Sequence, residues 1–410
     1  MRNEVAVSDV RREESMVAES ARAVVGSLRG LAAGEKVGAM LRDDAVCPRD
    51  IVPLVAAVDF HRRRGVDFTL AAPDGTTIAT AIAGLTADRL GPDIENPPVN
   101  PFGRVWRFSS YDEQNALANA MTLQLGKSAL LGKGVKEAFV WCLNEVMDNV
   151  LTHSSPGGDA VGYVMVTVAS ESKRLKACVF DLGIGLKASF AGTQYATTDD
   201  YTAITTAMKA NVTSGIGQGN GLWGLHELIR RAEDGSVSIA SGEAAYLFSP
   251  RDGVDGRVAH VPLAGFDGTT LVDFRMTLGG MIDFDSVFPG ALPMVDLWQE
   301  AHETEAGSVR YGVLEVAGGS GTRPSAAALR TLAENTIEND GKTVTLDFDG
   351  VTFCSSAFID ELVGKLIARY GFLGFTQKVR LVNVRGLSAQ LVNHSVVQRM
   401  AALRNDGDGQ

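Results

Sequence analysis

Residues 144–153 read Asn144-Glu-Val-Met-Asp-Asn-Val-Leu-Thr-His153, and they end a helix that the apolar spacing predicts over 136–152. Glu145 and Asn149 are four residues apart, so they lie one turn apart on a single face, and His153 extends this row. Such a polar row is also typical of a helix face in solvent. The opposite stripe is apolar and predicts burial: Phe139, Leu143, Val146, Met147 and Val150.

A second motif, Asp181-Leu-Gly-Ile-Gly185, directly follows a strand predicted at 175–181. Alternate glycines after a strand let the backbone approach a flat ligand closely. A carboxylate at this point can accept a hydrogen bond from an exocyclic amine. The motif alone decides little, because many strand-to-turn junctions have this sequence.

The third motif is glycine-rich and reads Gly215-Ile-Gly-Gln-Gly-Asn-Gly-Leu-Trp-Gly224, ahead of a helix predicted at 224–232. Glycines before a helix N-terminus favour an anion site, and the alternative is a flexible loop. A dinucleotide-binding βαβ unit is disfavoured because no strand leads into these glycines, and the GK[ST] of a P-loop is absent. A fourth element, Gly268-Thr-Thr270, opens a strand predicted at 270–276.

The four motifs, in this order, resemble the GHKL ATPase superfamily of gyrase, Hsp90, histidine kinases and MutL over residues 105–280. The resemblance implies an α+β fold, with a two-layer α/β sandwich known as the Bergerat ATP-binding fold. It also implies ATP and Mg2+ as cofactors. Asn149 would bind Mg2+, Asp181 would bind the adenine amine, Thr269 would support the Asp181 pocket, and 187–214 would be a mobile lid. The remaining residues would line the base or cradle phosphates: Gly183, Gly185, Gly217, Gly219, Gly221 and Leu222.

Glu145 occupies the position of the superfamily's general base, which activates a water in ATPases or a serine hydroxyl in serine kinases. The alternative is a positioning role. The pattern Asn-Glu-x-x-x-Asn-x-x-x-His is closest to anti-sigma-factor serine kinases. Sensor histidine kinases generally lack this carboxylate. In addition, no histidine of this chain has the sequence context of their phosphoacceptor.

The C-terminal part of the chain alternates strands and helices, with strands predicted at 313–316, 343–348 and 379–384 and helices at 326–339 and 356–370. It resembles a STAS-like domain and, through it, the anti-anti-sigma fold, in which a serine at the start of one helix accepts phosphate. The matching residue is Ser355. Cys354 and Ala357 depart from the family pattern, which has Asp and Gly there, and the alternative is that Ser355 or Ser356 only caps the helix.

The bulk composition excludes several classes of protein. The 410 residues carry a formal net charge of −11, which disfavours nucleic-acid and membrane-surface binding. No apolar run reaches the length of a membrane span, about 18 residues, and the N-terminus lacks the apolar core of a signal peptide. The scattered cysteines favour a reducing cytoplasm, and we expect Cys142 and Cys178 to be buried.

The predicted organisation has four parts and a Pro-rich linker at 91–101. The parts are a tail or frayed helix at 1–30, a small α/β unit at 31–100, an ATP-binding domain at 101–285 and a STAS-like domain at 306–405. In the small α/β unit we expect strands at 36–42 and 66–71 around a helix at 48–64.

Three functions fit this sequence. The first is a kinase-like or anti-sigma-type switch that acts on a protein partner. The second is an ATP-hydrolysing clamp that closes as a homodimer. The third is a nucleotide-gated binding module without turnover. The clamp branches carry a transducer segment with a catalytic lysine after the strand at 270–276, and no clear candidate follows that strand here, which favours the first or third function.

Overall fold

The computed structural model describes residues 3–4, 33–40, 47–72, 74–82, 100–153, 160–169, 171–210, 212, 221–260, 268–289, 297–305 and 307–407. The chain divides into two compact units. Unit 1 comprises Met1–Met121 and Glu137–Ala291, and unit 2 comprises Thr122–Lys136 and Leu292–Gln410. No helix among the described residues has both the length and the apolar character needed to cross a membrane.

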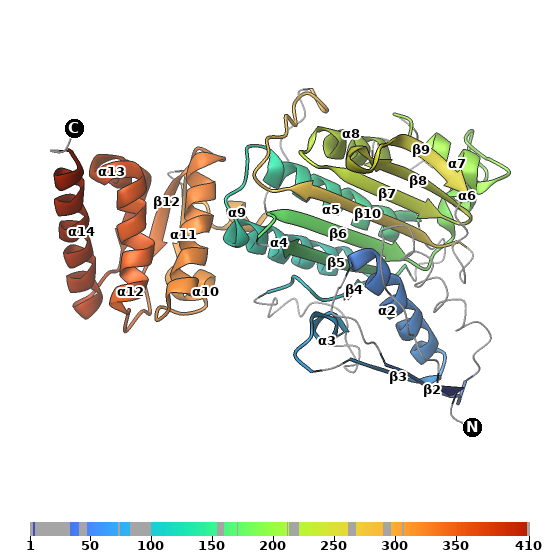
Figure 1. The fold of residues 1–410 in the computed structure, drawn as a ribbon, viewed down its shortest axis with the longest axis horizontal. Helices are drawn as coiled ribbons and strands as arrows, with labels where there is room; N and C mark the ends of the chain where they lie inside the picture. The colour runs from blue at the N-terminus through green and yellow to red at the C-terminus, as the bar shows by residue number, and fades with distance from the viewer. Residues whose placement is uncertain are drawn as a thin grey trace. The chain divides into compact units, whose positions relative to one another are not determined.

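Unit 1 is built on a seven-stranded sheet in the order β4-β5-β6-β10-β7-β8-β9, with every neighbouring pair antiparallel. β10 comes last in the sequence among the strands of this sheet, and it is inserted between β6 and β7 (Figure 1). The strands are β4 (Trp106–Phe108), β5 (Gly162–Ala169), β6 (Arg174–Asp181), β7 (Ser236–Ser241), β8 (Ala244–Ser249), β9 (Val254–His260) and β10 (Thr270–Thr277).

Helices cover one face of this sheet, where α4 and α5 run along the strands in Figure 1. The predicted apolar stripe of α5 is buried, including Phe139, Leu143 and Met147. Helix α8 packs closely on α5, because a Cβ at Gly224 would lie 2.4 Å from the Trp141 ring. The helices of this layer and its rim are α4 (Tyr111–Ser128), α5 (Val135–His153), α6 (Gly185–Ser189), α7 (Asp200–Ala207) and α8 (Gly221–Arg231).

A small α/β unit covers the opposite face of the sheet. Its parallel strands are β1 (Asn3–Glu4), β2 (Lys36–Met40) and β3 (Asp67–Ala71), and α2 (Pro48–Arg63) and α3 (Thr77–Ile82) complete it. Apolar side chains of α2 share one core with the sheet. A carboxylate also joins the two parts, because the Tyr163 hydroxyl donates to Asp59 Oδ2 at 2.6 Å.

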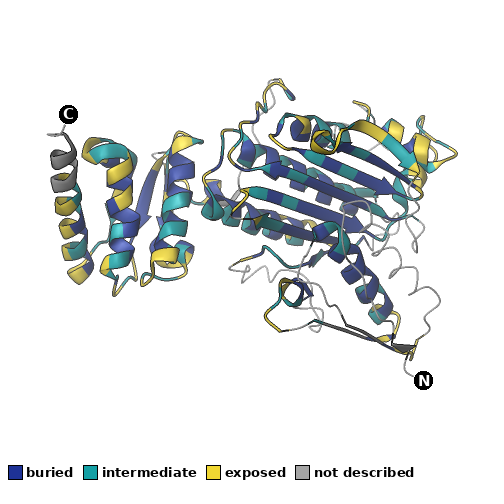
Figure 2. Cartoon of the chain, viewed as in Figure 1, coloured by how far each residue is buried: buried dark blue, intermediate teal, exposed yellow. Residues whose placement is uncertain are grey.

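Unit 2 contains a three-stranded parallel sheet in the order β11-β12-β13, flanked by helices. This agrees with the alternation of strands and helices that the sequence predicts for the C-terminal part of the chain. The strands are β11 (Ser308–Gly312), β12 (Thr343–Asp347) and β13 (Val379–Val382). The helices are α9 (Leu297–Ala301), α10 (Val313–Ala317), α11 (Arg323–Glu338), α12 (Ser356–Ile359), the π-helical turn η2 (Asp360–Gly364), α13 (Lys365–Lys378) and α14 (Gly386–Gly407). In Figure 2 the central strand β12 is mostly buried, whereas the helices of this unit expose part of their surface.

The structure corrects one predicted strand and adds elements that the sequence did not indicate. Residues 313–316 form α10, and the strand lies just before it, at β11, where Val309 and Tyr311 alternate with more exposed neighbours. The prediction followed the more apolar run, whereas strand pairing with β12 selects the preceding residues. Strands β8 and β9 and helices α6 and α7 were not predicted. The linker prediction at 91–101 lies mostly outside the described residues.

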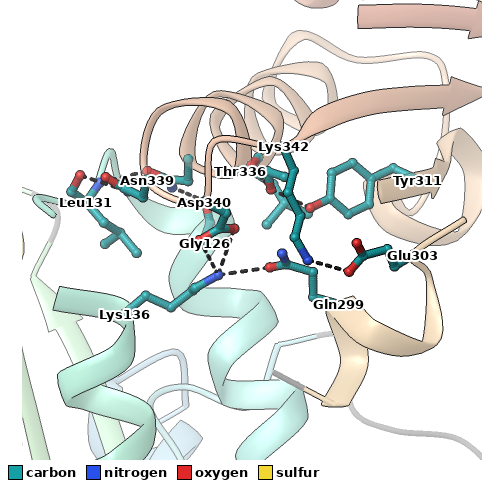
Figure 3. A network of polar contacts seen from close by, with 12 residues as sticks. Gly126, Leu131, Lys136, Gln299, Glu303, Tyr311, Thr336, Asn339, Asp340 and Lys342 are labelled. Carbon is teal, nitrogen blue, oxygen red and sulfur yellow. Dashed lines mark hydrogen bonds and ion pairs between the residues drawn. The ribbon is translucent and has the colours of Figure 1, made fainter. Parts of the chain in front are cut away.

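A buried polar network in unit 2 holds the segment 122–136 against α11 (Figure 3). Asn335 is central to it, because its amide nitrogen donates to the carbonyls of Gly126 and Ala129, each at 2.8 Å. Its amide oxygen accepts from Leu131 N at 2.8 Å. Nearby, Lys136 Nζ lies 2.9 Å from both oxygens of Asp340. One side chain therefore bonds three backbone groups of the segment 122–136.

We expect Asn335→Ala to destabilise unit 2 by about 2–4 kcal/mol, because three backbone groups lose their buried partner. Hydrogen exchange of the β11–β13 amides measures this free energy. Asn339→Ala, at the C-cap of the same helix, is the matched control. Asn339 gives a single bond, to Leu131 O at 3.2 Å, so its loss should cost clearly less. Equal effects of the two changes would contradict the central role of Asn335.

Candidate functional site

The polar row of α5 faces the first residue of α8. A Cβ at Gly221 would lie 3.0 Å from Glu145 Oε2 and 3.3 Å from Asn149 Nδ2. The backbone N–H groups of a helix N-terminus attract negative charge, and the helix dipole adds to this. Glu145 and Asn149, one turn apart on α5, therefore border the N-terminus of an eleven-residue helix. The alternative of a row facing only solvent does not describe these two side chains.

Asp181 is the last residue of β6, and its side chain is buried. Its Oδ1 accepts a hydrogen bond from Gly183 N at 2.8 Å, and the Thr270 hydroxyl provides a second bond. The carboxylate thus fixes the turn that begins after β6 and also joins β6 to β10. Its acceptor capacity is not exhausted by two bonds, because a carboxylate has about four lone-pair sites.

Three polar residues lie side by side on three strands at this end of the sheet. Asp181 pairs with Thr270, and Thr270 pairs with Ser241. Their neighbours Phe180, Leu271 and Ala240 belong to the core shared with α2. Because side chains alternate along a strand, Asp181, Thr270 and Ser241 project to the opposite face, which α5 and α8 cover. Ser241 Oγ lies 3.5 Å from Thr270 Oγ1.

Two turns with glycines meet at the edge of this row. Gly185 has φ +72°, and a Cβ there would lie 3.0 Å from Ser241 Oγ and 3.1 Å from Gly268 Cα. Gly268 has φ +83°, and a Cβ there would lie 2.7 Å from the Gly183 carbonyl oxygen. Only glycine tolerates both the dihedral and the approach. The structure therefore brings the Asp181–Gly185 and Gly268–Thr270 motifs into direct contact.

Burial changes the acidity of both carboxyl groups. It raises the pKa of Asp181 to about 7, against the opposing effect of the bonds from Gly183 and Thr270. It also raises the pKa of Glu145, and the negative charge of Asp148 adds to that increase. A carboxylate whose pKa is raised toward neutrality is a stronger base at pH 7, which is what proton abstraction from water or a hydroxyl requires.

The segment between the Asp181–Gly185 motif and the glycine-rich motif at 215–224 has its own small core. Phe190, Ala203 and Ala207 are buried together, and partly buried side chains pack against them: Leu186, Tyr195, Val212 and Leu222. Leu222, which the resemblance assigned to the nucleotide pocket, thus packs on the segment 186–207. It is also the residue after Gly221, so the start of α8 and this segment share one set of contacts.

Of the remaining predicted site residues, some lie outside the described part of the chain and the others have the following positions. Gly217 and Gly219 lie outside the described residues. Thr269 is buried, and the hydroxyl that bonds Asp181 is that of its neighbour Thr270. His153 ends α5, and burial lowers its pKa. Ser355 is half-buried and caps α12, because its Oγ accepts from Phe358 N at 3.0 Å, whereas Ser356 is exposed.

The side chains of this site could hold a divalent cation only together with oxygens from a ligand or from water. Among the described residues there is no group of three or more His, Cys, Asp or Glu side chains that could hold a metal. Mg2+ usually keeps several waters and takes one or two protein oxygens plus phosphate oxygens. Asn149 and Glu145 supply such oxygens beside Gly221. The side chains present therefore suit a cation that arrives with a phosphorylated ligand.

Sequence reasoning missed two residues beside the site, Ser241 and Asp200. Ser241 ends β7 and precedes a glycine, and Asp200 follows Asp199, which caps α7 by accepting from Thr202 N at 2.7 Å. An acid at the start of a helix is so common that its sequence gives no sign of a distant contact. Cys142 and Cys178 are buried, as predicted.

Comparison with known proteins identifies one part of the chain. Residues 325–386 match a family described as a STAS-like domain of unknown function (DUF4325). This segment runs from α11 to the start of α14, and it confirms the STAS-like resemblance of the C-terminal part. No protein of curated function has a significant sequence match to the chain.

We expect Asp181→Asn to stabilise unit 1 above neutral pH. The folded pKa of Asp181, about 7, exceeds the ordinary value of 3.8, so ionisation of the buried carboxyl opposes folding. The gain should be near zero below pH 4, grow as the pH rises to about 7 and stay constant above it. Each pKa unit corresponds to about 1.4 kcal/mol, which sets the gain at up to about 4 kcal/mol.

Urea denaturation of the variant and the wild type between pH 4.5 and 8.5 measures this difference. Asp148→Asn is the control, because it removes a carboxylate that is exposed on α5. A gain that does not depend on pH, or a loss of stability at pH 8, would contradict the assignment of a buried titrating carboxyl.

Proposed function

We propose that unit 1 binds ATP together with Mg2+ in the manner of the GHKL superfamily, and that the protein is a kinase-like or anti-sigma-type switch acting on a protein partner. The packing of Gly221 against Glu145 and Asn149 carries this proposal. A helix N-terminus beside a carboxylate and an amide suits a triphosphate with its cation and a reaction at its end.

The Asp181 turn supports the base end of the same ligand. Asp181 has free acceptor capacity, and the glycine contacts at Gly185 and Gly268 leave the backbone without side chains where a planar ring would lie. Adenine offers an exocyclic amine to such an acceptor. In this proposal Asp181 accepts from the adenine amine while Thr270 and Gly183 N hold the carboxylate in place.

Glu145 is proposed as the general base. Its raised pKa favours proton abstraction, and its position beside Gly221 supports a role at the phosphate end of the proposed ligand. Glu145 would accept the proton of a water molecule or of a hydroxyl group on a protein substrate. Mg2+, when bound with the nucleotide, would neutralise charge on the phosphates, and Asn149 would hold it through Oδ1.

The STAS-like unit is proposed as the part that recognises the partner. The family that matches residues 325–386 is described as a domain of unknown function. The role proposed here therefore depends on the resemblance to anti-anti-sigma proteins. In that comparison Ser355 is the phosphoacceptor. Because Ser355 caps α12 and Ser356 is exposed beside it, either hydroxyl is a candidate, and a serine on another protein is the alternative acceptor.

Nucleotide binding and turnover test the proposal directly. Asp181→Asn and Asn149→Ala should each abolish binding of a nonhydrolysable ATP analogue in calorimetry with Mg2+ present. Glu145→Gln should keep binding and lose turnover by about 10²–10⁴-fold. Binding that is unchanged in both Asp181→Asn and Asn149→Ala would overturn the site.

Asp148→Asn is the matched control for Glu145→Gln on the same helix. It should keep turnover, but the acid limb of the pH–rate profile should move to lower pH, because Asp148 contributes to the raised pKa of Glu145. A wild type that binds ATP but neither releases phosphate nor labels any protein would favour the nucleotide-gated binding module.

Mass spectrometry after incubation with ATP locates the acceptor. An internal switch predicts phosphate on Ser355 or Ser356 that is lost in Glu145→Gln. Ser355→Ala and Ser356→Ala, made separately, identify the residue. The absence of phosphate on both, with labelling of a co-purified protein, would place the substrate on the partner.

A further inference from the structure

The turn between β7 and β8, Ser241 to Glu243, contacts two helices of the segment 185–207. Leu186 N donates to Ser241 Oγ at 2.9 Å, at the start of α6. Glu243 N donates to Asp200 Oδ2 at 3.0 Å, at the start of α7. Two residues of one tight turn are therefore bonded to the N-terminal ends of two successive helices.

The middle residue of the turn makes these contacts possible. Gly242 has φ +59°, and a Cβ there would lie 2.2 Å from Asp200 Oδ2. Any side chain would therefore displace the carboxylate. Asp200 Oδ1 also lies 3.7 Å from Lys187 Nζ on α6. Asp200 thus joins α6, α7 and the turn through a single carboxylate.

The same turn is connected to the proposed base pocket. Leu186 directly follows Gly185, where the turn that starts at Asp181 ends. Ser241 pairs with Thr270, which in turn bonds Asp181. Because Ser241 is buried, its hydroxyl is held on one side by this strand row and on the other by the Leu186 N–H. A change at Ser241 therefore alters the contacts that hold the Asp181 turn.

The segment that these bonds hold is also the one that packs on Leu222, next to Gly221. Its position therefore affects both ends of the proposed ligand. We infer that Ser241 and Asp200 are positioning residues that latch the segment 185–207 to the β7–β8 turn and thereby slow nucleotide release. This inference rests on the proposed function, because it assigns the latch to the same site.

Stopped-flow kinetics with a fluorescent ATP analogue and Mg2+ test the latch in the full chain. Ser241→Ala and Asp200→Ala should each raise the dissociation rate on the order of tenfold, the effect of losing one hydrogen bond. The association rate should change little. Ser241→Thr keeps the hydroxyl and should restore slow dissociation. Glu243→Gln, an exposed change on the same turn, should match the wild type.

Hydrogen exchange of the ligand-free protein gives a second measurement that does not depend on nucleotide. The amides of 186–207 should exchange faster in Ser241→Ala and Asp200→Ala, while those of β5, β6 and β10 stay protected, which also shows that the variants fold. Wild-type dissociation rates and wild-type exchange in both variants would overturn the latch and leave the proposed function intact. Failure of the wild-type protein to bind the analogue would overturn the proposed function and, with it, the effect of the latch on release.

Discussion

The arrangement of unit 1 depends on one buried carboxylate. Asp181 ends β6, holds the following turn through Gly183 N and joins β10 through Thr270. An isolated charge in this position would oppose folding, and burial raises the pKa of Asp181 to about 7. A group that destabilises the folded protein when it is ionised is typical of sites where function outweighs stability.

The contacts around this carboxylate depend on the strand order of the sheet and on glycine at two turns. β10 must lie between β6 and β7 for Thr270 to meet both Asp181 and Ser241. The turns at Gly185 and Gly268 must then approach each other to within van der Waals contact, which a side chain on either would prevent. The surface at this end of the sheet is therefore formed by backbone and by the small polar side chains of Asp181, Thr270 and Ser241.

In unit 2 the corresponding polar side chains stabilise the fold through several hydrogen bonds each. Its parallel sheet is bonded at the carboxyl ends of its strands by Asp347, which accepts from Arg310 on β11 and from Asn383 after β13. These bonds hold the pKa of Asp347 below its usual range, opposing the effect of burial. The polar network of Asn335 fixes the segment 122–136 in the same unit. Both are fully bonded groups whose removal should cost stability, in contrast to Asp181.

The sequence alone determined the helix of Glu145 and Asn149, the strands that end at Asp181 and begin at Thr270, and the STAS-like class of residues 325–386. Each of these is local, since apolar spacing, a strand end and a glycine pair are all visible within a few residues. The strand at β11 was placed wrongly because its pairing with β12 decides its limits, and that pairing joins residues about 35 apart.

Only the tertiary structure brought Gly221 to Glu145, Thr270 to Asp181, and Asp200 to the turn at Gly242. These partners are separated by dozens of residues, so no local pattern of charge or hydropathy indicates them. Their contacts depend on the insertion of β10 between β6 and β7 and on the packing of α8 against α5. The sequence therefore determined which chemical groups the site contains, and the order of strands in the sheet decided which of them touch.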